Sequence, residues 1–571
     1  MKKWWIIGML AVMVPWSVMA QVEKQVEVSK NYVPSLEPAT KLAIRPDKTD
    51  TMQLRPEIDY TITPLSLQTR LATRPMQPAR VTYWEFNRPN PFYVKAGVGY
   101  PLQSVVDVYA STQNPGTGYA LGYLNHEGRY AKIKNDFGLK NNSTRMANRV
   151  GAAAGKYLGR HIVEGDVHYD HRLFHRYGAH YPSEWKHVPG DQVGYSDVVA
   201  TVRVGDDFQD LSRTNFEFKV AGDLFYDHSD LIGVAERGRQ SNFGVQGRVA
   251  RAFAKSRFDI GLGYTWMWGG RALENVDEHL LSSTIRYARH LARSSMEVGV
   301  DYYYNRSETA TEERTKHYVF PYVRLEFNLI KTAVKPFVEM DGSLQTNDFQ
   351  SLATQNPYLP ASTWLMKSTP EWAVRGGLMG YSKNNRFRYR AYLEGALQDD
   401  HIYWLLPVLD EAAPTMYAAG WFVPWQERQT RYTMGAEVTY RPATNWVLDA
   451  AARFYAYDDE HKLQHGAPEW EAEFGVRYEG RKVRVGLRAV MQGERWWSMV
   501  MSDDTKVIEE RLIDRYKMPS AVDVQFDFEW RMSGMMALFV EGRNLLNSDL
   551  YDLPTMPEYG INALVGVRLT F

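Results

Sequence analysis

The chain has 571 residues, of which 44% are hydrophobic and 13% aromatic, and its 67 basic residues match its 67 acidic residues in number. That hydrophobic content excludes wholesale disorder, and the balanced charge gives no basic surplus of the kind that favours nucleic-acid binding. Cysteine is absent, which excludes disulfides, thiolate nucleophiles and cysteine-ligated zinc.

Residues 1–20 have the pattern of a secretory signal peptide. Two lysines precede an apolar stretch, and the small residues Val18 and Ala20 stand where a signal peptidase requires them. A membrane anchor is the alternative, which Pro15 and the small-residue site disfavour. We therefore expect an exported protein, and the rest of the sequence has no apolar run of about 18 residues that would predict a spanning helix.

Residues 21–91 differ in composition from everything that follows them. Each proline in this segment fixes its own φ and biases the preceding residue towards extended geometry. The segment holds nine prolines, namely Pro34, Pro38, Pro46, Pro56, Pro64, Pro75, Pro78, Pro89 and Pro91. We therefore predict an extended periplasmic or lumenal segment and not an independent domain.

Apolar and charged residues alternate in steps of two along much of residues 92–571. Glu469–Glu479 reads EWEAEFGVRYE, and Ser520–Arg531 reads SAVDVQFDFEWR. A strand places such alternating residues on opposite faces, whereas a helix would spread the charges around its circumference. The pattern predicts strands with one apolar and one polar face.

Short, turn-like connections alternate along this region with long ones, such as residues 346–370 and 398–428. Short turns at one end and long loops at the other are typical of outer-membrane barrels. We predict an all-β fold, a transmembrane antiparallel β-barrel of about 22 strands with short periplasmic turns and long extracellular loops. A soluble sandwich or propeller is the alternative, which strands of roughly ten residues, the membrane-crossing length, disfavour.

If the apolar faces of these strands meet lipid, the charged faces line the lumen. Such charges suit a polar channel wall or a docking surface, although any water-filled lumen needs a polar lining, so they predict no particular substrate. The predicted lumen-lining residues are Asp523, Asp527, Glu529, Arg531, Glu469, Glu471, Glu473, Arg477, Arg484, Arg488, Arg386, Arg388 and Arg390.

A barrel of about 22 strands is wide, and barrels of that size are normally plugged. An open lumen of this width would leak. We therefore expect that residues 21–91, inward-folded loops or a partner protein fill it.

Histidines cluster between residues 161 and 187. His168, with Asp166 and Asp170, falls on a predicted inward face, and His175 falls in the following loop. These four residues are candidates for a metal or acid–base site, but their spacing matches no ligand motif. No nucleophile elbow, phosphate loop or zinc-protease motif occurs in the sequence. We therefore expect no enzymatic activity, no cofactor and no bound metal.

The C-terminal stretch ALFVEGRNLLNSDLYDLPTMPEYGINALVGVRLTF resembles the final hairpin of TonB-dependent outer-membrane receptors. The resemblance rests on Asn544–Asn547, on Tyr551, on a proline-containing loop and on a last strand that ends in Phe571. It implies a 22-stranded barrel in the outer membrane of a Gram-negative cell. It also implies that Phe571 is the signal that barrel-assembly machinery reads during insertion.

The sequence departs from that family before the barrel. Such receptors carry an N-terminal globular plug and a TonB-contact box, whereas only residues 21–91 precede the barrel here, and they contain no plug motif. The chain in this respect resembles plugless exported barrels of the Bacteroidota. The departure puts energised uptake in doubt.

Two functions remain open at this point. In the first, the barrel transports a solute or polymer, with residues 21–91 or a partner closing the lumen. In the second, it is a non-transporting scaffold subunit of a barrel-assembly or secretion complex, with its aromatic-rich loops as docking surfaces. Expected partners are outer-membrane lipid and lipopolysaccharide, the assembly machinery, and outer-membrane or periplasmic proteins, with no nucleic acid.

Overall fold

The computed structural model describes residues 90–112, 116–181, 183, 190–230, 236–360, 363–408, 418–501 and 512–571. The predicted signal peptide, and the proline-rich segment except for Asn90 and Pro91, lie outside the described residues.

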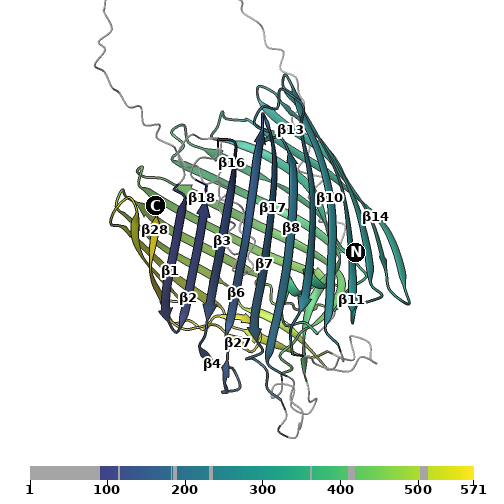
Figure 1. Cartoon of the computed structure of the whole chain (residues 1–571), viewed down its shortest axis with the longest axis vertical. Coiled ribbons are helices and arrows are strands. Elements are labelled where there is room, and N and C mark those ends of the chain that lie inside the picture. Colours follow the sequence, from purple (N-terminus) through teal and green to yellow (C-terminus); the bar gives the residue numbers. More distant parts are fainter. Residues whose placement is uncertain are drawn as a thin grey trace, which may run out of the picture. The chain divides into compact units, whose positions relative to one another are not determined.

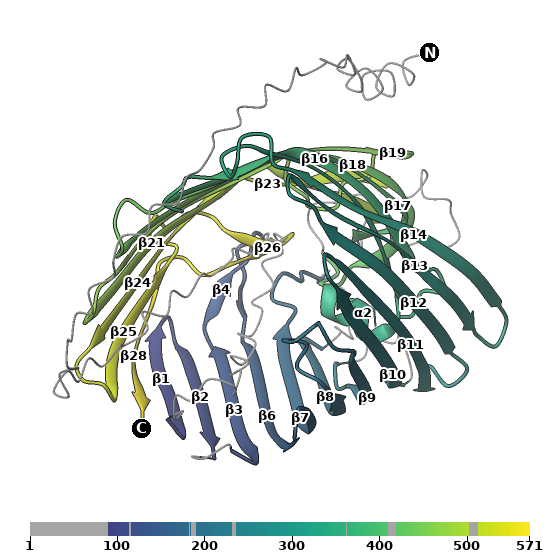
Figure 2. The ribbon, with the colours of Figure 1, turned by 90° about the horizontal axis from the view of Figure 1, so that it is seen from above.

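Within the described residues, 22 antiparallel strands form a closed barrel, as the sequence predicted. Figure 1 shows the strands side by side, and Figure 2 shows the ring that they make. In chain order they are β1 (Phe92–Tyr100), β2 (Gln103–Ser111), β3 (Gly118–Arg129), β6 (Arg145–Leu158), β7 (His161–His175), β8 (Gln192–Gly205), β9 (Asn215–Asp227), β10 (Gly238–Phe253), β11 (Ser256–Arg271), β12 (Asp277–His290), β13 (Ser294–Glu308), β14 (Glu313–Phe327), β15 (Lys335–Gln345), β16 (Thr369–Tyr381), β17 (Phe387–Val408), β18 (Val423–Tyr440), β19 (Trp446–Asp459), β20 (Trp470–Glu479), β21 (Val483–Gln492), β24 (Ala521–Arg531), β25 (Met536–Arg543) and β28 (Asn562–Thr570).

Shorter elements lie in the loops between these strands. They are β4 (Lys132–Lys134), β5 (Lys140–Asn142), α2 (Phe349–Gln355), β22 (Arg495–Met501), β23 (Leu512–Met518), β26 (Tyr551–Leu553) and β27 (Met556–Pro557). None of the described helices is long and apolar enough to cross a membrane.

The first and last strands close the ring. Strand β1 pairs with β2 on one side and with β28 on the other, with Tyr93 opposite Thr570 and Tyr100 opposite Ala563. At the seam, Phe92 and Phe571 exchange backbone hydrogen bonds of 2.9 and 3.0 Å, and their rings stack with centroids 5.4 Å apart.

The two faces of each strand follow the alternation of the sequence. On β24, Trp530 is exposed on the outer face, whereas Glu529 and Arg531 on the other face are joined by a 2.8 Å ion pair. Exposed Val565 on β28 and Phe474 on β20 continue the outer apolar surface. A period of two is what sets these faces apart, because successive side chains of a strand point in opposite directions.

The two ends of the barrel differ in their connections. At the end that carries Phe92 and Phe571, which we call the short-turn end, β6 and β7 are joined by residues 159–160, and β10 and β11 by residues 254–255. At the opposite, long-loop end, residues 346–368 and 493–520 connect their strands. The short-turn end faces the periplasm in barrels of this class.

The predicted loop at residues 398–428 is partly wrong. Strand β17 continues to Val408 and β18 begins at Val423, with Leu405 opposite Val423 and a register shift between Gln398 and His401. The strands continue because side chains such as Leu405 are buried among other loops, where their backbone groups also need partners.

Candidate functional site

The inner wall of the barrel carries ion pairs between neighbouring strands. Arg149 on β6 lies opposite Asp170 on β7 and binds it at 2.5 Å. On the next strand, Arg203 binds Glu164 at 2.8 Å and Glu217 at 2.6 Å. These charges are therefore each held by an opposite charge on an adjacent strand.

The structure places eleven of the thirteen predicted lumen residues within strands, on faces opposite the exposed apolar side chains. Glu469 and Arg386 lie just before β20 and β17, outside the strands. The eleven are Glu471, Glu473 and Arg477 on β20, Arg484 and Arg488 on β21, Asp523, Asp527, Glu529 and Arg531 on β24, and Arg388 and Arg390 on β17. Their contact with a transported solute stays a prediction.

Several of these residues pair with one another or with adjacent strands. Arg488 binds Glu473 at 2.6 Å, and Arg390 binds Glu339 at 2.7 Å. Glu529 receives Arg568 at 2.6 Å as well as Arg531. The blocks of like charge seen in the sequence are thus partly balanced by opposite charges on adjacent strands.

At the long-loop end, loops fold inward and share a buried apolar core. We call the described residues of loops 130–144, 176–191, 346–368, 409–422, 493–520 and 544–561 the cap. Figure 2 shows α2 and β26 inside the ring of strands. Cap and adjoining strand residues in this core include Tyr177, Phe349, Leu352, Tyr358, Trp404, Phe422, Trp497, Met499, Met518 and Met556.

Most of the aromatic residues that loops 346–370 and 398–428 offered as partner anchors belong to this interior, whereas Trp421 is only partly buried and lies outside both apolar clusters. Tyr358 and Trp404 are buried in the apolar core, and Trp364 packs against it. Tyr403 is buried in a second, smaller cluster, against which Trp425 packs. Their rings therefore serve the packing of the loops, which removes them from the outer surface.

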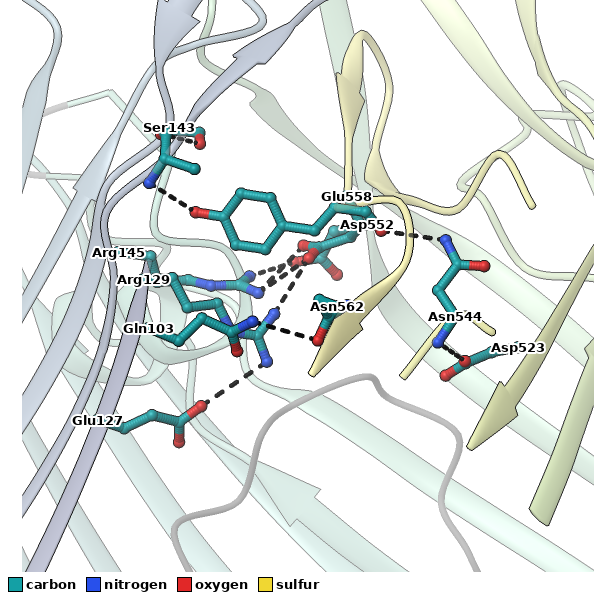
Figure 3. A network of polar contacts seen from close by, with 12 residues as sticks. Gln103, Glu127, Arg129, Ser143, Arg145, Asp523, Asn544, Asp552, Glu558 and Asn562 are labelled. Carbon is teal, nitrogen blue, oxygen red and sulfur yellow. Dashed lines mark hydrogen bonds and ion pairs between the residues drawn. The ribbon is translucent and has the colours of Figure 1, made fainter. Parts of the chain in front are cut away.

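A hairpin of the cap is tied to the wall by ion pairs (Figure 3). Strands β26 and β27 carry this hairpin between β25 and β28. Arg145 of β6 reaches Asp552 at 3.3 Å and Glu558 at 3.1 Å. Arg129 of β3 also reaches Glu558, at 3.3 Å. Burial raises the pKa of the Asp552 carboxyl, Glu558 adds to that rise, and Arg145 partly offsets it.

Hydrogen bonds between side chains and backbone groups also fix this hairpin in place. The Asn544 side chain donates to Tyr559 O at 3.0 Å, and the backbone N–H of Asn544 donates to Asp523 Oδ1 at 2.8 Å. Thr555 donates to Gly178 O at 3.0 Å. Asp523, one of the predicted lumen residues, therefore positions the cap.

Helix α2 docks on the wall through amide side chains. Gln240 of β10 is fully buried; its Nε2 donates to Asp348 Oδ1 at 2.7 Å, and its Oε1 accepts from Gln350 N at 2.9 Å. Gln350 Nε2 donates to Asp197 Oδ2 at 2.8 Å. Asp348 also caps the helix by accepting from Ser351 N. The polar docking contacts surround apolar Phe349, which enters the cap core.

Three of the four candidate metal residues lie on one face of β7. Asp166 accepts from Tyr123 at 2.8 Å and lies 2.7 Å from His168 Nδ1, and Asp170 is held by Arg149. His175, predicted in the following loop, is instead the last residue of the strand, and its Nδ1 lies 2.8 Å from Thr144 O. The structure therefore gives each of them a protein partner.

Another group, which the sequence reasoning missed, meets the geometric requirement for a metal ion better. Within the described part of the chain, Glu427, Glu460 and His461 alone place three ligand atoms within 4.8 Å of one another. His461 Nδ1 lies 2.7 Å from Glu427 Oε2. The pair Glu460–His461 was visible in the sequence, but Glu427 joins it only through the pairing of β18 with β19.

Solved structures share this fold at low sequence identity. An iron transporter, FrpB from Neisseria meningitidis, matches with a TM-score of 0.63 and 9% identity, over 85% of this chain and 82% of that one. The pyoverdine outer membrane receptor FpvA from Pseudomonas aeruginosa matches with a TM-score of 0.61 and 11% identity, over 85% and 79%. The copper transporter OprC matches with a TM-score of 0.62 and 12% identity, over 85% and 82%.

No protein-family model and no curated protein matches the sequence. The solved structures therefore agree with the resemblance of the C-terminal hairpin in their fold and not in their sequence. The described residues have the fold of these outer-membrane receptor and transporter barrels.

Proposed function

We propose that the protein transports a solute across the outer membrane through its barrel, with the cap closing the long-loop end at rest. The observation that carries this proposal is how the cap is attached. Its hairpin at residues 544–561 meets the wall through the ion pairs of Arg129 and Arg145, whereas helix α2 packs on the wall through Phe349, which contacts Tyr195 and Phe225. Partly exposed ion pairs contribute little net stability, so the hairpin is the part of the cap that can leave the wall at the smallest cost.

The substrate class that we propose first is a metal ion or a metal chelate. The proteins of similar structure are an iron transporter, a copper transporter and a pyoverdine receptor. The ion pairs of the inner wall present groups of both signs to a passing ligand. The closure of the short-turn end by residues 21–91 or by a partner is part of the same proposal.

The alternative is a scaffold subunit of an outer-membrane assembly. It would need large exposed docking surfaces on the loops. The burial of Tyr358 and Trp404 in the cap takes away two of the anchors on which that function depended, so we place transport first.

Conductance in planar bilayers tests the proposal. We expect little current from the intact protein and large, steady currents when Arg129→Gln and Arg145→Gln are combined with deletion of residues 21–91. Arg213→Gln with the same deletion is the matched control, because Arg213 lies in an exposed short turn. Absence of current in every form, together with copurification of a stoichiometric partner, would favour the scaffold.

A further inference from the structure

The loop that follows β19 folds back onto the end of β18. Strand β19 ends at Asp459, opposite Gln429, whereas β18 extends beyond that pair to Val423. Glu427 lies two residues further along β18 and therefore faces the same side as Gln429. The backbone N–H of His461 donates to Glu427 Oε1 at 2.9 Å, and His461 Nδ1 lies 2.7 Å from Glu427 Oε2. One carboxylate thus meets both the backbone and the ring of the same histidine.

Glu460 brings a third ligand group to the same place. One ligand atom from each of Glu427, Glu460 and His461 lies within 4.8 Å of the other two. Two ligand atoms of a tetrahedral metal ion, each about 2.1 Å from it, lie about 3.4 Å apart. The spacings in this group lie on both sides of that value, since His461 Nδ1 and Glu427 Oε2 are 2.7 Å apart. Small side-chain rotations therefore bring the three groups to the spacing of metal ligands.

The carboxylate of Glu427 is buried without a permanent cation beside it. Its side chain is 6% exposed, and its ion-pair partner among the described residues is His461, which is charged only when protonated. Glu394 and Glu471, two other carboxylates of the inner wall, are equally buried at 7% exposure, but an arginine holds each of them. A buried carboxylate needs a compensating charge. A bound cation would supply that charge at Glu427.

The loop that carries Glu460 and His461 is also held from its other side. Asp459 Oδ1 accepts from Leu463 N at 2.7 Å, and Leu463 is buried in the smaller apolar cluster. Gln464 N donates to Ser498 Oγ at 2.9 Å, and Gln464 O accepts from Ser498 N at 2.9 Å. The loop therefore contacts β22 of the cap as well as the wall, and the ligand groups are ordered before any ion binds.

We propose that Glu427, Glu460 and His461 bind a divalent transition-metal ion such as Zn²⁺, which fastens the loop after β19 to the wall. Zinc takes imidazole nitrogen and carboxylate oxygen together, whereas Ca²⁺ and Mg²⁺ take oxygen ligands. The sequence predicted no bound metal, since its spacing does not bring Glu427 to the other two residues. The ion holds the closed arrangement and is not the transported solute, so the proposal does not rest on transport.

Calorimetric titration of the full chain with Zn²⁺, after purification in detergent and removal of metal, tests the site. The ligand variants are His461→Gln and Glu460→Gln, and the second changes an exposed side chain, so that it leaves the fold undisturbed. The matched control combines His279→Gln with Asp277→Asn, another histidine–carboxylate pair, whose atoms lie 3.3 Å apart on β12. The shift of each protein on boiling in a gel reports whether the barrel is folded.

Loss of either ligand should weaken the tightest Zn²⁺ site by about ten-fold or more, since even loss of a group that only orients a ligand costs about that much. The control should keep the wild-type affinity. At a free Zn²⁺ concentration about ten times the wild-type Kd, hydrogen exchange of residues 460–466 should slow about ten-fold in the wild-type protein and remain unchanged in His461→Gln.

Equal Zn²⁺ affinity in all four proteins, or a loss in the control as large as in the ligand variants, overturns the proposal. Binding of Ca²⁺ with the same dependence on His461 and Glu460, without binding of Zn²⁺, overturns it as well. Zinc binding that leaves the exchange of residues 460–466 unchanged overturns the role of the ion in fastening the loop. Planar-bilayer currents test transport separately and do not alter these outcomes.

Discussion

Arg145 and Glu558 are separated by 413 residues in the chain, and the guanidinium of one lies 3.1 Å from the carboxylate of the other. One is on the barrel wall and the other on a hairpin inside the barrel (Figure 3). This contact joins the fixed part of the molecule to the part that we propose to move.

Removal of that contact should loosen the hairpin. Arg145→Gln leaves the carboxylates of Asp552 and Glu558 without their main partner, at a cost of about 1 kcal/mol to the closed arrangement, because the pairs are partly exposed. We expect faster proteolysis within residues 544–561 while the barrel remains folded. Arg145→Glu combined with Glu558→Arg should restore part of the resistance, and failure of the exchange to do so would argue against a direct pair.

Closure of the hairpin should weaken as pH rises. Because burial raises the pKa of Asp552, the closed hairpin binds this proton more tightly than an open, solvated one. The contribution of the proton to closure is therefore fully present below the ordinary aspartate pKa of about 4 and is lost as pH rises through the raised value. Hydrogen exchange of residues 551–557 at pH 5 and pH 8 measures it.

Asp552→Asn should abolish that pH dependence, since the amide does not titrate. Asp549→Asn, at an exposed position of the same loop, is the control and should keep it. An unchanged pH dependence in Asp552→Asn would assign the effect to another group.

Helix α2 should depend on one buried amide. Gln240→Ala leaves Asp348 Oδ1 and the N–H of Gln350 without this partner, which costs about 1–3 kcal/mol. Hydrogen exchange at residues 349–355 should accelerate by about ten-fold, because 1.4 kcal/mol corresponds to one decade. Gln209→Ala, in an exposed short turn, should leave exchange of the helix unchanged.

The inner wall should set ion selectivity once the barrel conducts. Glu529 holds both Arg531 and Arg568, so Glu529→Gln leaves two guanidiniums without their carboxylate. This change is tested in the conducting variant that combines Arg129→Gln, Arg145→Gln and the deletion of residues 21–91. In that variant, the reversal potential in a salt gradient should shift towards the value for an anion-selective pore. No shift would mean that ions do not pass along this part of the wall.

The ring pair at the seam should assist barrel assembly. Phe571→Ala removes the ring stack with Phe92, which is worth about 0.5–1.5 kcal/mol. The same change removes the predicted assembly signal. The heat-shifted fraction on gels should fall during refolding into vesicles. Phe253→Ala removes another aromatic contact at the same end, with Phe258, and should have a smaller effect if Phe571 acts as a signal.

Local pattern was enough to predict much of the barrel. The alternation in Glu469–Glu479 corresponds to β20 and that in Ser520–Arg531 to β24, since a period of two depends only on neighbours in the chain. The end of β17 was missed because residues 398–408 lose the simple alternation where both faces become buried in the cap. The pairing of β17 with β22, with Leu406 opposite Met499, gives those residues backbone partners that no local pattern predicts.

The sequence by itself determined the fold class, the approximate strand number, the faces of the strands and the position of long loops, because strand alternation and turn spacing are short-range properties. Only the tertiary structure decided where the loops go. Thr555 meets Gly178 across 377 residues of sequence, and such a contact depends on the closure of the whole barrel. The pairing of inward charges was decided in the same way, since it requires strands to stand side by side.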